Sequence, residues 1–135
     1  MAKILLVDDE KHILQYYTEE LSVDGHQVVA IDSGEQLLNK IALHQPDIIV
    51  LDIKLVEWDG LDLLLDIRDR YYNLPVILCT AYDTFKEDPR SIAADYYVIK
   101  SFDLTDLKTK IRKAIDTYLP THTAETQDGF SSDTI

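Results

Sequence analysis

Three carboxylates stand at the ends of short apolar runs, where they could form one reactive site. Asp8 and Asp9 directly follow the run 4–7, and Asp52 directly follows the run 48–51. Such runs are typical of buried strands in a parallel sheet, whose ligands bind just outside the carboxyl ends of the strands. Two like charges about 4 Å apart repel by ~4 kcal/mol at an effective dielectric near 20. The pattern therefore predicts a bound cation, and oxygen ligands favour a hard divalent ion such as Mg²⁺.

Two later apolar runs end in a hydroxyl and an amine. Thr80 follows the run 76–79, and Lys100 follows the run 97–99. Each position alone has a plainer explanation, because paired aspartates often form turns, threonine suits a strand end and lysine is usually solvated. Four such coincidences would be needed at four strand ends, so the pattern favours one shared site.

Short apolar runs alternate with segments of helical periodicity. The runs lie at 4–7, 28–31, 48–51, 76–79 and 97–99. The helical segments cover 13–21, the stretch from Ser33-Gly34 through Ile41, the stretch from Gly60 through Tyr71, and 104–119. Asp103 is a candidate N-cap for the last of them. This alternation predicts βαβ units with right-handed crossovers, and therefore an α/β fold with a doubly wound, five-stranded parallel sheet.

Two segments depart from this alternation. Between Thr80 and Tyr96 the helical pattern is weak, and Asp88-Pro89 combines an N-cap with proline at the first helical position. This predicts a shortened or irregular fourth helix of about a turn and a half. Residues 121–135 are mostly polar and are predicted to be a disordered tail, which leaves 1–120 as one domain.

Composition restricts the partners of the chain. Its 135 residues include 25 acidic and 13 basic side chains, for a formal net charge of −12. Such a surface repels nucleic acids and anionic membranes. No apolar run approaches the length of a membrane span, and the immediate first strand argues against a signal peptide. The single cysteine, Cys79, lies in an apolar run and is predicted to be a buried hydrophobe. These features favour a cytoplasmic protein.

Four motifs in order give the chain a family resemblance. They are Ile4-Leu5-Leu6-Val7-Asp8-Asp9-Glu10, Asp52-Ile53-Lys54 with Asp59-Gly60 downstream, Thr80-Ala81-Tyr82, and Tyr97-Val98-Ile99-Lys100. From about Lys3 to Leu119 the chain resembles the response-regulator receiver domains of two-component signalling, of the CheY-like stand-alone type. The resemblance implies a flavodoxin-like sheet with strand order 2-1-3-4-5.

The resemblance also implies a reaction at Asp52. This carboxylate would take a phosphoryl group from a histidine kinase or a histidine phosphotransfer protein, as one step of a phosphorelay. Mg²⁺ would be held by Asp9 and Asp52 directly, by Asp8 mainly through water, and by the backbone carbonyl of Lys54. The chain would catalyse only its own phosphorylation and dephosphorylation.

Further roles follow from the same resemblance. Lys100 and Thr80 would contact phosphoryl oxygens, the small Ala81 would leave the attack path open, and Tyr82 would flank the site. Thr80 and the aromatic Tyr97 would form the switch that responds to phosphorylation. Tyr96 is the alternative switch residue, but the spacing to Lys100 favours Tyr97.

Three positions depart from the family pattern. Ser101 replaces the proline that usually follows the lysine, and a non-proline cis bond costs ~2.5–4 kcal/mol, so we predict a trans bond between Lys100 and Ser101. The loop after Asp52 has Val56 where the family usually has proline, followed by Glu57-Trp58. Trp58 is expected to be partly exposed near the site and to report phosphorylation by fluorescence. The segment from Thr80 to Lys100 is about two residues shorter than usual, which predicts an unusual, loop-like and mobile partner surface.

Other functions remain as alternatives. The main one is a receiver-like module that binds an unknown downstream protein without phosphorylation. A flavodoxin-like FMN protein would need a Ser, Thr or Gly phosphate loop after the first strand, where this chain has Asp8-Asp9-Glu10. An aspartate-nucleophile phosphatase would need an acid at the position of Lys54.

Overall fold

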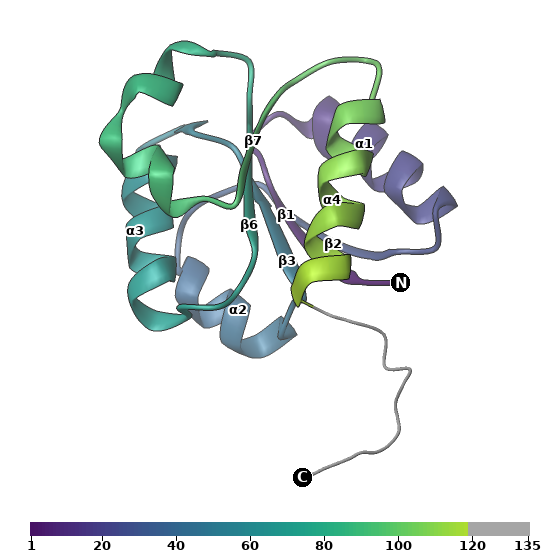
Figure 1. The fold of residues 1–135 in the computed structure, drawn as a ribbon, viewed down its shortest axis with the longest axis horizontal. Helices are drawn as coiled ribbons and strands as arrows, with labels where there is room; N and C mark the ends of the chain where they lie inside the picture. Colours follow the sequence, from purple (N-terminus) through teal and green to yellow (C-terminus); the bar gives the residue numbers. More distant parts are fainter. Residues whose placement is uncertain (119–135) are drawn as a thin grey trace, which may run out of the picture.

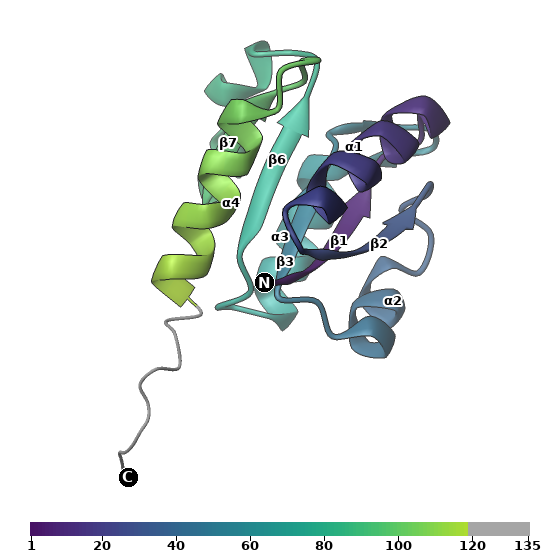
Figure 2. The same ribbon diagram turned by 90° about the vertical axis from the view of Figure 1, so that its right-hand side faces the viewer.

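A parallel sheet of five strands forms the centre of the molecule, in a computed structural model that describes residues 1–118 (Figure 1). The strands are β1 (Lys3–Val7), β2 (Gln27–Ile31), β3 (Ile48–Leu51), β6 (Val76–Thr80) and β7 (Tyr96–Ile99). Their order across the sheet is β2-β1-β3-β6-β7, and Figure 2 shows them side by side from β7 to β2. The predicted order 2-1-3-4-5 is confirmed.

Helices cover both faces of the sheet. Figure 1 shows α1 (Lys11–Val23) and α4 (Thr105–Tyr118) on one side and α2 (Leu37–His44) and α3 (Gly60–Arg70) on the other. Alternate residues of each strand point to opposite faces, so Ile4 and Leu6 pack with α1 and α4 while Leu5 and Val7 pack with α2 and α3. The central strands β1, β3 and β6 are buried on both faces, which explains why their sequences are continuous apolar runs.

The second helix begins later than the periodicity indicates. α2 starts at Leu37, whereas the sequence predicts a start at Ser33-Gly34. The Ser33 hydroxyl accepts a hydrogen bond from the Glu35 N–H at 3.0 Å, which forms a turn, and Gln36 has a left-handed φ of 53°. These local bonds compete with helix formation, so the prediction was wrong by one turn.

The fourth helix is replaced by two short 3₁₀ helices, η1 (Thr84–Glu87) and η2 (Pro89–Ala93). The Asp88 carboxylate accepts a hydrogen bond from the Arg90 N–H at 2.9 Å, with Pro89 at the first helical position. The predicted shortening and its N-cap are therefore confirmed. Arg90 of η2 forms ion pairs with Asp59 at 3.1 Å and Asp62 at 2.7 Å, which connect η2 to the start of α3.

An additional hairpin follows β3 and was not predicted. Its strands are β4 (Lys54–Leu55) and β5 (Trp58–Asp59), joined by Val56 and Glu57, and Glu57 has a φ of 66°. Two-residue strands are too short to produce an alternating sequence pattern, which explains the omission.

Three other predictions concern single positions or the chain end. Cys79 is buried, as expected, and the bond between Lys100 and Ser101 is trans. The tail predicted at 121–135 and the domain boundary at 120 lie outside the described residues. No helix within residues 1–118 is long and apolar enough to cross a membrane.

Candidate functional site

The sheet register brings the predicted acids and the lysine to one edge. Val7 pairs with Leu51 across β1 and β3, so Asp8 and Asp52 leave neighbouring strands at the same level. The Asp52 N–H donates to the Val7 carbonyl at 3.0 Å, which continues the ladder by one residue. At the end of β6, the Thr80 carbonyl accepts from the Lys100 N–H at 2.8 Å. The residues of the site therefore lie at the carboxyl ends of β1, β3, β6 and β7.

The Lys100 ammonium lies between three carboxylates. Its Nζ is 2.8 Å from Asp8 Oδ2, 2.9 Å from Asp52 Oδ2 and 2.8 Å from Glu10 Oε1. Asp8 and Asp52 are buried, with 3% and 4% of their surfaces exposed, while Glu10 is exposed. One oxygen from each acid lies within 4.8 Å of the others. Three negative charges thus share one positive charge, so the repulsion is only partly offset.

Burial and hydrogen bonding shift the acid–base equilibria of these groups. Desolvation raises the pKa of Asp8 and of Asp52, and the hydrogen bonds from Lys100 oppose this rise without cancelling it. Burial acts to lower the pKa of Lys100, but its hydrogen bonds to the three carboxylates together raise it. The exposed Glu10 has a lowered pKa, chiefly because it accepts a hydrogen bond from Lys100.

Glu10 is the member of this cluster that sequence reasoning missed. It stands immediately after the two aspartates, and its N–H donates to Asp8 Oδ1 at 2.9 Å, which turns the chain into α1. That turn brings its side chain to Lys100. The acid that directly follows Asp8-Asp9 was the available signal, although sequence gives no direction for the side chain.

Asp9 lies outside the group of three acids. Its Oδ2 accepts a hydrogen bond from the Val56 N–H, in the turn of the β4–β5 hairpin, at 2.9 Å. The other oxygen, Oδ1, is not used in that bond. Asp9 therefore links the first strand's loop to the segment that follows Asp52.

Thr80 supplies a buried hydroxyl whose hydrogen-bonding capacity is unused. The residue is 0% exposed, and its Oγ1 has no hydrogen-bond partner among the described residues. A buried hydroxyl without a partner is costly, and the Thr80 hydroxyl is free to donate to a group that binds at this edge of the sheet.

Gly60 allows α3 to begin directly against the backbone that follows β3. Its N–H donates to the Ile53 carbonyl at 2.7 Å, and a Cβ at this position would lie 2.2 Å from the Asp52 carbonyl oxygen. Asp59 caps the helix by accepting from the Leu61 N–H at 2.9 Å. In the Asp59-Gly60 motif, the aspartate therefore caps α3 and the glycine leaves room for the Asp52 carbonyl oxygen.

Aromatic side chains border the site on the side of η1. The Tyr97 hydroxyl donates to the Tyr82 carbonyl, and Lys86 Nζ lies 5.4 Å from the centre of the Tyr97 ring. Tyr82 and Ala81 are exposed, and Lys54 Nζ lies 5.9 Å from the Tyr82 ring centre. Tyr97 packs with the core under α2 and α3, whereas Tyr96 packs with the opposite core.

Trp58 is partly exposed, as expected, at 39%. It belongs to β5 and lies over Gly34 and beside Leu63. It therefore borders the pocket between α2 and α3, whose lining residues do not include the three acids.

Comparisons with known proteins agree with this geometry. The response regulator receiver domain family matches residues 4–112. The chain is 34% identical over 116 residues to the regulatory protein AtoC of Escherichia coli and 39% identical over 105 residues to the response regulator protein FleR of Pseudomonas aeruginosa. These matches cover 84% and 76% of this chain but only 25% and 22% of those proteins, so the chain spans about a quarter of their length.

Solved structures give a similar result. The response regulator TrrA of Thermotoga maritima in complex with Mg²⁺–BeF superposes with a TM-score of 0.81 at 38% identity, over 84% of this chain and 99% of that one. TrrA in complex with the histidine kinase ThkA superposes with a TM-score of 0.80 at 37% identity, over 85% and 99%. Because the family model matches most of its length, the chain belongs to the response regulator receiver domain family.

Proposed function

We propose that Asp52 accepts a phosphoryl group from a phosphohistidine of a partner protein and that the new charge switches a protein-binding surface. A carboxylate oxygen of Asp52 would attack the phosphorus, the bond from phosphorus to the imidazole nitrogen would break, and the histidine would leave with the electron pair and take up a proton. The observation that carries the proposal is the buried Asp52 carboxylate 2.9 Å from Lys100 Nζ, at the sheet edge where Thr80 holds an unpartnered hydroxyl.

The residues at this edge fit a divalent metal. Carboxylate oxygens of Asp8, Glu10 and Asp52 converge within 4.8 Å, and such hard oxygen donors suit Mg²⁺. Asp9 and Asp52 would hold the ion directly, Asp8 mainly through water, and Lys54 through its backbone carbonyl. Asp9 can keep its bond to Val56 and offer Oδ1. When bound, Mg²⁺ neutralises negative charge on the carboxylates and on the phosphoryl oxygens.

Lys100 and Thr80 would bind the transferred group. The ammonium, released from some of its carboxylate partners, would contact one phosphoryl oxygen as a compact charge. The Thr80 hydroxyl would donate to another and so gain the partner that it lacks. Ala81 is small enough to leave the line of attack open, and Tyr82 with Lys54 would limit access of water.

The switch would consist of Thr80 and Tyr97. Tyr97 is tied to the loop after β6 by its bond to the Tyr82 carbonyl, so a shift of Thr80 toward the phosphoryl group would alter that loop. The segment of η1 and η2 continues from the same loop and would present the changed surface to an unknown downstream protein.

The upstream partner would be a histidine kinase or a histidine phosphotransfer protein. Support comes from the structure of TrrA in complex with a histidine kinase, because TrrA matches 85% of this chain. The reaction would take place in the cytoplasm, and the chain would act as a catalyst only on its own acceptor.

Phosphorylation by acetyl phosphate tests the proposal. We expect intact-mass measurement to show a gain of one phosphoryl group that requires Mg²⁺ and that is absent in Asp52→Asn. Asp116→Asn, which changes an exposed acid on α4, is the matched control and should be phosphorylated like the unchanged protein. Equal phosphorylation of Asp52→Asn, or none in any variant, would contradict the proposal, and the second result would favour a phosphorylation-independent binding module.

A further inference from the structure

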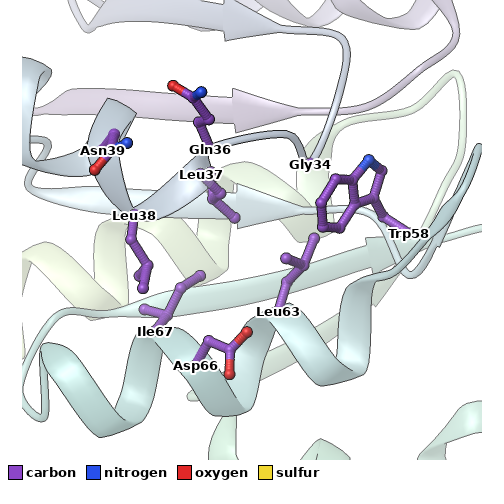
Figure 3. Close-up of a pocket in the computed structure, with 9 residues that line it drawn as sticks. All are labelled: Gly34, Gln36, Leu37, Leu38, Asn39, Trp58, Leu63, Asp66 and Ile67. Carbon is purple, nitrogen blue, oxygen red and sulfur yellow. The ribbon is translucent and has the colours of Figure 1, made fainter.

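A small, largely apolar pocket lies between α2 and α3, with Trp58 of the β4–β5 hairpin at its edge (Figure 3). Its volume is about 200 Å³. Figure 3 shows Leu38 and Ile67 facing each other from the two helices at one end, and Leu63 beside Trp58 at the other end. The pocket is below the usual ~300–1,000 Å³ of small-molecule sites, so it suits one or two side chains better than a cofactor.

Trp58 is held at the wall of this pocket by a close backbone contact. A Cβ at position 34 would lie 2.9 Å from Trp58 Cγ, so the glycine lets the indole lie directly over the β2–α2 loop. The ring keeps 39% of its surface exposed. An indole that is fixed on one side and open on the other is a typical anchor point in protein interfaces.

The pocket and its neighbouring residues carry more acid than base. Asp66 lines the pocket from α3. The exposed Glu35 and Glu57 stand next to the lining residues Gly34 and Trp58 in the sequence, and a base, Lys40, stands next to Asn39. The ion pairs formed among residues 1–118 include none of these three acids. This excess of unpaired acid at an apolar pocket matches a partner that flanks an apolar side chain with positive charge.

We propose that this pocket, hereafter the Trp58 pocket, binds a basic segment of a partner protein that inserts one apolar side chain against Trp58. The apolar contact would supply the anchor, and Glu35, Glu57 and Asp66 would attract and orient flanking Lys or Arg side chains. The site differs from the Asp52 site in position and chemistry, and binding requires no phosphoryl group.

Fluorescence of Trp58, the only tryptophan of the chain, reports occupancy of the pocket directly. The probe is a set of twelve-residue peptides with one central Leu, Met, Phe or norleucine flanked by Lys and Arg. At least one peptide should change the Trp58 emission saturably, and its counterpart with Ser at the centre should not. Failure of every peptide, or equal binding of the Ser counterpart, would overturn the proposal.

Two charge-reversal variants separate docking from general attraction to an acidic protein. Asp66→Lys should weaken binding by about fivefold or more, because it reverses a charge on the rim. Asp116→Lys makes the same change on α4, remote from the pocket, and should weaken binding by less than about twofold. Equal losses in both variants would show nonspecific attraction and refute the proposal.

A second copy of this chain is the other possible occupant. Trp58 emission that changes with protein concentration in the absence of peptide, and that the peptides do not alter, would assign the pocket to self-association and overturn the proposal. Asp52→Asn should bind the peptides like the unchanged protein, so a negative result in the phosphorylation assay leaves this test unaffected.

Discussion

At the scale of single residues, Lys100 determines the state of the site in the absence of other cations. Its ammonium contacts oxygens of Asp8, Glu10 and Asp52 at 2.8–2.9 Å, and two of these acids are buried. Burial raises the pKa of Asp8 and of Asp52, and the hydrogen bonds from the single Lys100 ammonium do not cancel this rise. The residues that would perform the chemistry therefore reduce the stability of the fold that holds them.

The substitution Asp52→Asn tests this cost. A carboxyl whose pKa is raised in the folded state stabilises the protein below its unfolded pKa, and that contribution is lost as the pH rises through the folded pKa. Asp52 follows this case, since burial raises its pKa above 3.8. At pH 7 and without Mg²⁺, Asp52→Asn should raise the free energy of unfolding by about 1 kcal/mol.

The pH dependence of that gain provides the control. The gain should shrink as the pH falls from 7 toward 4, because Asp52 then becomes protonated in the unchanged protein. Urea unfolding at several pH values measures both quantities. Equal stability of the two proteins at pH 7 would show that Lys100 compensates the Asp52 charge fully.

Thr80→Val should separate stability from function. Valine has nearly the shape of threonine and removes the buried hydroxyl that has no partner within residues 1–118, so the free energy of unfolding should rise by about 1 kcal/mol. Phosphorylation by acetyl phosphate should slow by at least about tenfold, because one hydrogen-bond donor to the phosphoryl group is lost.

Thr18 offers a matched control for this substitution. Its Oγ1 is also buried without a partner among the described residues, but it belongs to α1. Thr18→Val should stabilise the protein without slowing phosphorylation. If both variants were phosphorylated at the same rate, Thr80 would have no part in the reaction.

At the scale of secondary structure, the central strands β1, β3 and β6 could be predicted because each is buried on both faces and thus apolar throughout. Because Asp8, Asp52 and Lys100 directly follow strands, their meeting at one edge of the sheet could also be predicted. Glu10 and Asp9 could not be assigned in the same way, because their directions depend on the turn into α1 and on the Val56 N–H. Local turns and two-residue strands leave no periodic pattern, which is why the start of α2 and the hairpin were missed.

The loop after β7 explains how the chain tolerates Ser101 in place of proline. The buried Tyr17 hydroxyl donates to the Ser101 carbonyl at 3.2 Å, and the Ser101 N–H donates to that hydroxyl at 3.3 Å. Burial raises the pKa of Tyr17 to about 12, so the hydroxyl stays protonated. The trans bond before Ser101 thus positions two backbone groups that satisfy a buried side chain.

Ser101→Pro should therefore destabilise this chain, although proline is usual in the family. Proline lacks the N–H that Tyr17 accepts, and we expect a loss of about 1 kcal/mol in urea unfolding. Ser101→Ala keeps the N–H and is the control, and in a Tyr17→Phe background the cost of proline should fall. A proline variant as stable as the alanine variant would show that the Tyr17 contact contributes nothing.

At the scale of the whole molecule, the sheet holds its acids at one edge while the apolar layers lie between the sheet and its helices. A charge of −12 adds general repulsion to the local repulsion at Asp52. Any cation bound by the folded chain alone must stabilise it by mass action, by about 2.7 kcal/mol when its concentration is 100 times the dissociation constant.

Mg²⁺ should therefore reverse the order of stability between the unchanged protein and Asp52→Asn. Without Mg²⁺ the variant is expected to be more stable, because one buried charge is gone. With saturating Mg²⁺ the unchanged protein should become the more stable of the two, since it keeps the ligand that the variant has lost. Thermal unfolding with MgCl₂ and with NaCl at matched ionic strength separates specific binding from screening of the net charge. Asp116→Asn should respond like the unchanged protein, and a Mg²⁺ effect of the same size in Asp52→Asn would place the ion away from Asp52.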